Sequence, residues 1–228
     1  MPDEVKVYND DVSGFVTRVD RISVEFAKSL TANVTHMSDA DKTRALAYFM
    51  LIGLGFMLLE MNFLQRLTLY LADPIYSAAV VIGAFLVFAG LGSQLSRRWR
   101  RDAGGVVRRA GLLVAGIAAG YIFLLPRLLS ATAHWPMPVR LAVAAALIAP
   151  LAMAMGQMFP VALRRLAAGG GALVPWCWAI NGFASVVATV AATLLAVEIG
   201  FAAVAGIGAG AYVLAAVVGP AGRAKPSA

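Results

Sequence analysis

The chain has 228 residues, of which 61% are hydrophobic and only 14% are charged. Soluble domains carry about 25% charged residues, so this composition excludes an ordinary water-soluble domain. The formal net charge is +7, but the arginines flank apolar runs and form no basic face with interleaved aromatic side chains, so nucleic acid is not expected as a partner.

The first 44 residues are polar, and we expect residues 1–44 to form a cytoplasmic head. A helix is predicted within it, because apolar residues recur at steps of three and four: Phe15, Val19, Ile22, Phe26 and Leu30. This amphipathic helix would lie on the membrane surface or on a protein partner, or pack on the protein's own cytoplasmic end. A polar linker is expected over residues 31–42, where Ser38 and Asp41 have capping-box spacing.

Long apolar runs follow the head, with lengths near the roughly 20 residues that cross about 30 Å of hydrocarbon. We therefore expect an all-α fold, a polytopic membrane helix bundle of about six spans over residues 45–220, embedded in the lipid bilayer. The expected spans are residues 45–71, 76–95, 110–125, 139–163, 174–197 and 201–218. Residues 126–138 are expected to be a loop, and residues 221–228 a basic tail.

The arginines predict the orientation. Residues 96–109 contain six arginines, Arg164 and Arg165 follow the fourth span, and Arg223 and Lys225 lie in the tail. With six spans these segments share one side with the head, and short loops rich in Lys and Arg stay in the cytoplasm. The sequence therefore predicts a multi-pass protein of the cell (inner) membrane with both termini in the cytoplasm.

Small residues let helices approach closely in lipid. We expect them to mark helix contacts on the second, third, fifth and sixth spans: Gly83 and Gly90; Gly116 and Gly120; Ala184, Ala188 and Ala192; and Ala205, Gly206, Gly208 and Gly210.

Glu60 is the carboxylate that stands out within a span, where a charge costs about 2.5–3.5 kcal/mol on insertion scales. At 1.5 Å per residue it lies ~22 Å from the start of the first span, in the outer half of the membrane. Its own helix has no cation three or four residues away, and Arg66, six residues on, is expected to face away. Glu60 is therefore expected to form a substrate or proton site, or to fasten helices together.

Other polar residues within the spans extend this candidate site. Asn181, Ser185 and Thr189 are spaced by four and form one polar stripe, with Thr189 nearer the depth of Glu60. Gln157 is expected at the depth of Asn181, so these two amides could hydrogen bond across the bundle. The stripe is interpreted as helix glue or as part of a pathway.

Pro160 frees the carbonyl of Gly156, which would kink the fourth span or break it and expose backbone to a ligand. His36 and His134 have no neighbouring ligands, and the single cysteine, Cys177, excludes an intrachain disulfide, so no metal is assigned. Nucleotide-binding glycine loops and the common hydrolase motifs are absent from the sequence, so no cofactor and no catalytic residue is assigned.

Four blocks in order resemble the C-terminal membrane half of large bacterial spermidine-synthase-like membrane proteins. They are residues 53–66, with GLGFMLLEM then Gln65 and Arg66; residues 90–93, GLGS; residues 156–160, GQMFP; and residues 176–183, WCWAINGF. The resemblance covers roughly residues 46–218. It implies the membrane module of that family without its Rossmann-like aminopropyltransferase or methyltransferase domain, because this sequence has no nucleoside-binding glycine loop or acidic catalytic motif.

Three functions remain open from the sequence. The first is a noncatalytic membrane module that acts as a subunit or anchor beside a protein partner, reached through the head or the helix faces. The second is a small transporter or channel for a cationic or proton-coupled solute, with Glu60 in its site. The third is the membrane part of a split aminopropyltransferase-like enzyme, which requires a catalytic partner chain.

Overall fold

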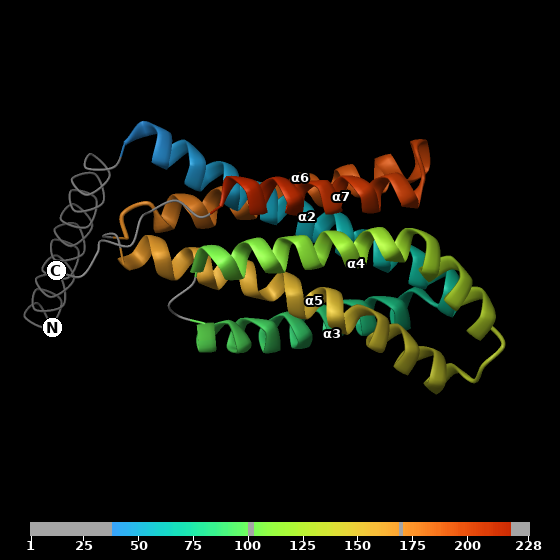
Figure 1. The fold of residues 1–228 in the computed structure, drawn as a ribbon. Coiled ribbons are helices and arrows are strands. Elements are labelled where there is room, and N and C mark those ends of the chain that lie inside the picture. Colours follow the sequence, from blue (N-terminus) through green and yellow to red (C-terminus); the bar gives the residue numbers. More distant parts are fainter. Residues whose placement is uncertain (1–37, 100–102, 169–170, 220–228) are drawn as a thin grey trace, which may run out of the picture.

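The computed structural model describes residues 38–99, 103–168 and 171–219, and every regular element in them is helical (Figure 1). The elements are α2 (Asp39–Leu71), α3 (Pro74–Leu95), the short 3-10 helix η1 (Ser96–Trp99), α4 (Ala103–Thr132), α5 (Met137–Ala168), α6 (Val174–Glu198) and α7 (Phe201–Val218). Six of them are long and apolar enough to cross a membrane. The predicted all-α, six-span fold is confirmed, whereas the predicted amphipathic head helix and basic tail lie outside the described residues.

Helix α2 is the centre of the bundle. It packs most extensively against α6 and α7 and also contacts α3 and α5, while α4 packs between α5 and α7 (Figure 1). Its inward face is fully buried, with Tyr48, Phe49, Leu59 and Leu67 each no more than 2% exposed. Helices α3 and α6 both flank α2 but do not pack against each other.

Capping explains why α2 begins at Asp39, six residues before the expected span. The Ser38 hydroxyl oxygen accepts from the backbone N–H of Asp41 at 3.2 Å and donates to the Asp41 carboxylate at 2.8 Å. The first of these bonds satisfies a backbone N–H that a helix start leaves unpaired, and the second orients the capping hydroxyl. Residues 39–42, expected as a linker, are therefore helical.

The expected loop over residues 126–138 is wrong for its first half, because α4 continues through Pro126 to Thr132. Tertiary packing outweighs the backbone hydrogen bond that proline removes. Leu125 and Leu129 stay buried on one face, and the Thr132 hydroxyl lies 2.9 Å from the Tyr70 hydroxyl of α2. Similarly, α5 runs unbroken through Pro150 and Pro160, so the broken-helix alternative is excluded.

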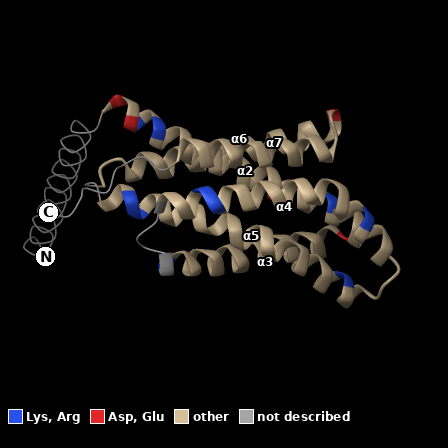
Figure 2. Cartoon of the chain, in the orientation of Figure 1, with Lys and Arg blue, Asp and Glu red and all other residues tan. Residues whose placement is uncertain are grey.

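The basic segments meet at one end of the bundle, as the alternation of six spans requires. Arg164 at the end of α5 donates to the Ser96 hydroxyl at 2.9 Å, at the end of α3. Arg44 near the start of α2 donates to the Val218 carbonyl at the end of α7. In the view of Figure 2 the coloured charges lie toward the ends of the helices and the middle of the bundle is tan.

The glycine contacts expected on α3 and α4 are wrong. A Cβ built at Gly83, Gly90, Gly116 or Gly120 would meet no atom within 4 Å, so these glycines lie on the outer faces of their helices. On α3 the close approach is at Gly92 instead. The stripe predicted on α6 is confirmed as buried, at Ala184, Ala188 and Ala192. On α7, Ala205 is buried and Gly208 packs against Leu59, whereas Gly206 and Gly210 have open space.

Candidate intramembrane site

Glu60 lies on the strip of α2 between α3 and α6. One turn earlier, Phe56 packs edge to face against Phe85 of α3, with ring centroids 5.7 Å apart. Met57, its neighbour, packs instead into the cluster that contains Ala188 of α6. Residues three and four apart share a helix face, so Glu60 follows both and lies between the two flanking helices. Its side chain is 8% exposed.

No hydrogen bond or ion pair of the Glu60 carboxylate is observed within the described residues; the nearest ion pair along α2 joins Lys42 and Asp39 near its start. Arg66 points the other way, as predicted. Its Nε donates to the Asn62 side chain at 3.2 Å, and its guanidinium lies 5.3 Å from the centroid of the Phe201 ring. We therefore observe no hydrogen bond by which Glu60 could hold two helices together in the described part of the chain.

The polar stripe of α6 divides into one residue that joins two helices and two that do not. The Asn181 amide donates to the Phe49 carbonyl of α2 at 2.9 Å. The Ser185 and Thr189 hydroxyls instead donate to α6's own backbone, at Asn181 and Ser185, both at 2.9 Å. Ser185 and Thr189 are half-buried, and their remaining lone pairs are free to accept from another molecule.

Two contacts define the level of Glu60 relative to its neighbours. Gly53 of α2 lies against Asn181 of α6, which runs parallel to α2. Seven residues farther along each helix, Glu60 therefore lies at the level of Ala188. The Ser77 hydroxyl of α3 donates to the Leu67 carbonyl at 3.0 Å. Helix α3 runs antiparallel to α2, so a step of seven residues forward from Ser77 matches a step of seven residues back from Leu67. This register places Ala84 at the level of Glu60. Ala84 and Ala188 therefore lie at this level, and on the α3 side the buried Phe85 ring also spans it, because it packs against both Phe56 and Phe63.

Aromatic rings close the space between α5 and α6 on the side of the basic segments. The Trp178 ring of α6 lies 4.8 Å from that of Phe159 in α5, which in turn lies 5.3 Å from Phe49 of α2. Ser185 lies two helical turns after Trp178 on the same face of α6. The polar stripe therefore lies on the side of α6 that faces α3 and α5. We call this surface, formed by Glu60, Leu64, Ser185 and Thr189, the lateral face.

The hydrogen bond expected between Gln157 and Asn181 is wrong, because Gln157 donates to the Met153 carbonyl of its own helix at 3.2 Å. Equal depth does not fix rotation about the helix axis. At about 100° per residue, Gln157 lies roughly 160° around α5 from Phe159, the residue that faces α6. Gln157 therefore does not belong to the lateral face.

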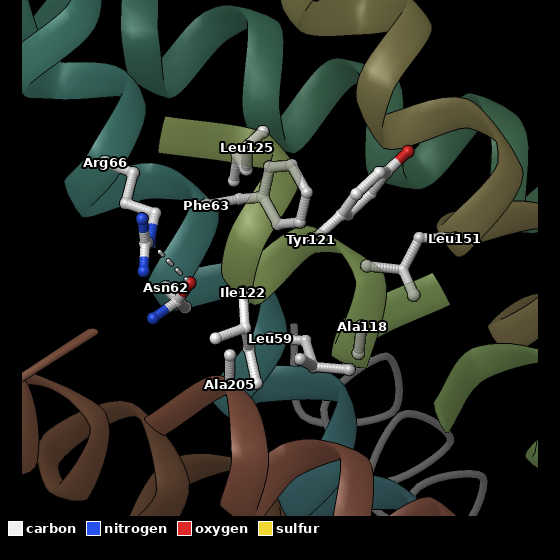
Figure 3. Close-up of a pocket in the computed structure, with 10 residues that line it drawn as sticks. All are labelled: Leu59, Asn62, Phe63, Arg66, Ala118, Tyr121, Ile122, Leu125, Leu151 and Ala205. Carbon is white, nitrogen blue, oxygen red and sulfur yellow. Dashed lines mark hydrogen bonds between the residues drawn. The ribbon is translucent and has the colours of Figure 1, made fainter. Parts of the chain in front are cut away.

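A second feature was missed in the sequence: a small pocket lined by residues of α2, α4, α5 and α7 (Figure 3). Its lining is mostly apolar and includes Leu59, Phe63 and Leu125. Asn62 and Arg66 lie at one end, and the Asn62 amide also donates to the Phe201 carbonyl at 2.6 Å. One side of the pocket could have been found in the sequence, because four of its lining residues lie on one face of α2: Leu59, Asn62, Phe63 and Arg66. The sequence does not show which other helices complete the lining.

Among the described residues, no group of three or more His, Cys, Asp or Glu side chains could hold a metal ion, and Cys177 is buried. The fold and this site define a multi-pass helical membrane protein with a buried carboxylate on a lateral face. Comparison of the chain with protein-family models, with curated proteins and with solved structures gave no match.

Proposed function

We propose that this protein is a noncatalytic integral membrane module that acts as a subunit or anchor of a membrane complex and meets its partner at the lateral face. The observation that supports the proposal is Glu60, a carboxylate within a span that has no described partner. Ionisable groups in membranes are costly and face a cavity, a partner or a water-filled space. Here the carboxylate lies beside two half-buried hydroxyls at the flank of the bundle, which favours a neighbouring protein.

Crosslinking in native membranes tests this function. A photoreactive phenylalanine analogue at Thr189 is expected to give a discrete protein adduct. The same analogue at Val190, which is adjacent in sequence and 60% exposed on the outer surface of α6, is the matched control and should react with lipid. Lipid adducts alone from both positions would contradict the proposal.

A transporter or channel for a cationic or proton-coupled solute is the second candidate, and the same unpaired carboxylate supports it. In this case Glu60→Gln keeps the fold and abolishes solute uptake into vesicles, because the charge cycle is lost. Uptake by the isolated protein that requires Glu60 would favour transport over the subunit role.

The resemblance to spermidine-synthase-like membrane proteins supports a third candidate, the membrane part of a split aminopropyltransferase-like enzyme. The blocks that carry it include residues at close helix contacts: Gly53 with Asn181, and Gly92 and Gly156 at the α3–α5 contact. A helix-packing arrangement in common with that family would account for the similarity of these blocks. Co-purification of a separate chain with aminopropyltransferase activity would favour this candidate.

The orientation is part of the same proposal: both termini and the basic segments face the cytoplasm of an inner membrane. A topology reporter fused after Arg101 should read cytoplasmic, and one fused at His134 should read external, because Lys- and Arg-rich loops stay inside. An external signal at Arg101 would reverse the assignment.

A further inference from the structure

We infer that the lateral face binds a single transmembrane helix of a partner protein, and that a lysine or arginine of this helix pairs with Glu60. The inference rests on the proposed subunit function and names the chemistry of its partner.

The helices that border Glu60 supply no cation for it. Neither flanking helix contains a lysine or arginine, over Pro74–Leu95 in α3 or Val174–Glu198 in α6. The cation on α2 nearest to Glu60 in sequence, Arg66, is bonded to Asn62 and stacked on Phe201, on the opposite face of the helix. A basic group from a neighbouring molecule is the complement that this carboxylate lacks.

The shape of the lateral face suits a helix. Helices α3 and α6 flank α2 without packing against each other, and Ala84 and Ala188 lie level with Glu60 on the two sides. Both alanines are buried in the bundle, so a partner helix would meet the half-buried side chains beside Glu60 instead. Leu64, one turn farther along α2, adds a half-buried apolar side chain, and the Ser185 and Thr189 oxygens can accept from the partner.

The depth of the pair follows from the position of Glu60. It lies eleven residues before the end of α2 at Leu71, or roughly 16 Å at 1.5 Å per residue. The basic residue of the partner is therefore expected well inside the hydrocarbon, where a single unpaired lysine is costly and a paired one less so. This depth distinguishes the expected partner from helices whose basic residues lie only at the membrane surface.

Synthetic transmembrane peptides provide the probe. Leucine-rich peptides carry one Lys, Gln or Glu eleven residues from their outer end and are reconstituted with the purified protein in phosphatidylcholine vesicles. Energy transfer reports binding to a dye on Glu198→Cys, an exposed site, and the buried Cys177 should stay unlabelled. The Lys peptide is expected to bind roughly tenfold more tightly than the Gln peptide, the scale of a polar contact between helices in lipid.

Two variants test whether Glu60 itself is responsible. Glu60→Gln should abolish the preference for Lys, and Glu60→Lys should transfer it to the Glu peptide, which would also show that the exchanged side chain leaves the protein folded. The double variant Glu60→Gln with Val190→Glu moves the carboxylate to the outer surface of α6. Equal Lys preference in this double variant would overturn the inference, because any membrane carboxylate would then suffice.

The remaining outcomes separate this inference from the proposed function. No Lys preference together with a protein adduct at Thr189 rejects the basic partner helix and leaves the subunit role. Lys preference without an adduct in native membranes rejects the subunit role. Glu60-dependent association of two labelled copies of the chain, without peptide, would identify a second copy as the occupant and overturn the inference. Glu60-dependent uptake of a small cation would overturn it in favour of transport.

Discussion

Two helix pairs in this bundle use glycine differently. Between α3 and α5 the fit is reciprocal: a Cβ at Gly92 would overlap the Met153 carbonyl, and one at Gly156 would overlap that of Ala89. Between α2 and α6 the close approach is at Gly53 alone, where a Cβ would lie 2.6 Å from the Asn181 carbonyl oxygen. Both contacts bring backbones together, but the first has a glycine on each helix, whereas the second has a glycine on α2 only and meets Asn181, the first residue of the polar stripe.

The difference separates a contact that only stabilises the bundle from one that borders the lateral face, which we propose as a binding surface. In the α3–α5 contact the backbones themselves leave no room for a side chain. Along α2 and α6 the hydroxyls of Ser185 and Thr189 bond to their own helix, so they can accept from a neighbour without loss of a bond between the helices. Substitutions in the two contacts should therefore differ in size and kind.

The largest effect is expected for Gly156→Ala. The new methyl group overlaps the Ala89 backbone, and neither helix has a flexible side chain at this point that can move aside. Overpacking of this kind costs about 3 kcal/mol, measured as the free energy of unfolding in mixed micelles. Gly90→Ala is the matched control, since it also replaces a helical glycine but meets open space. Equal unfolding free energies for the two variants would show that α3 and α5 are not so closely packed.

An intermediate effect is expected for Gly53→Ala, about 1–2 kcal/mol. Its methyl group would lie 2.6 Å from the Asn181 backbone carbonyl oxygen, less close than the 2.1 Å found at Gly156, and 2.8 Å from the side-chain amide nitrogen, which can move aside. Unfolding in the same micelles measures the loss, with Gly182→Ala, which has open space, as the control. A loss as large as that of Gly156→Ala would mean that α6 is held as rigidly as α5.

The smallest effect belongs to the polar stripe. Asn181→Ala removes the hydrogen bond to the Phe49 carbonyl and should cost about 0.6 kcal/mol, the average for hydrogen bonds between membrane helices. Ser185→Ala removes only a bond within α6 and should leave the unfolding free energy nearly unchanged. If Ser185→Ala costs as much as Asn181→Ala, the Ser185 hydroxyl contributes to the contact between α2 and α6.

The spans could be predicted from the sequence because length and hydropathy are local properties. The alternation of basic segments also indicated which helix ends meet, and the contacts of Arg164 with Ser96 and of Arg44 with Val218 agree. The extent of α4 could not be read in this way, because its continuation past Pro126 depends on Tyr70 of a different helix.

Which helices pack against each other could not be predicted from the sequence. Gly83, Gly90 and Gly92 are equivalent as small residues, and only the position of α5 makes Gly92 a contact and leaves the other two on the outer face. The same ambiguity affected Gln157, whose depth was estimated but whose rotation about the α5 axis was not. Glu60 was selected as a candidate because its cost in a span does not depend on which neighbours it has, whereas the lateral face required the arrangement of α3 and α6 around α2.

The central position of α2 has a consequence for biogenesis. Among the described spans it is made first, yet its main partners, α6 and α7, are made last. Until they insert, Asn62 lacks its acceptor at Phe201 and Gln65 lacks its acceptor at Thr193, so α2 remains in the bilayer with polar groups that its own helix does not satisfy. We therefore expect a stage during synthesis at which α2 most needs protection by a chaperone or insertase. This stage ends when α6 and α7 insert and pack against α2.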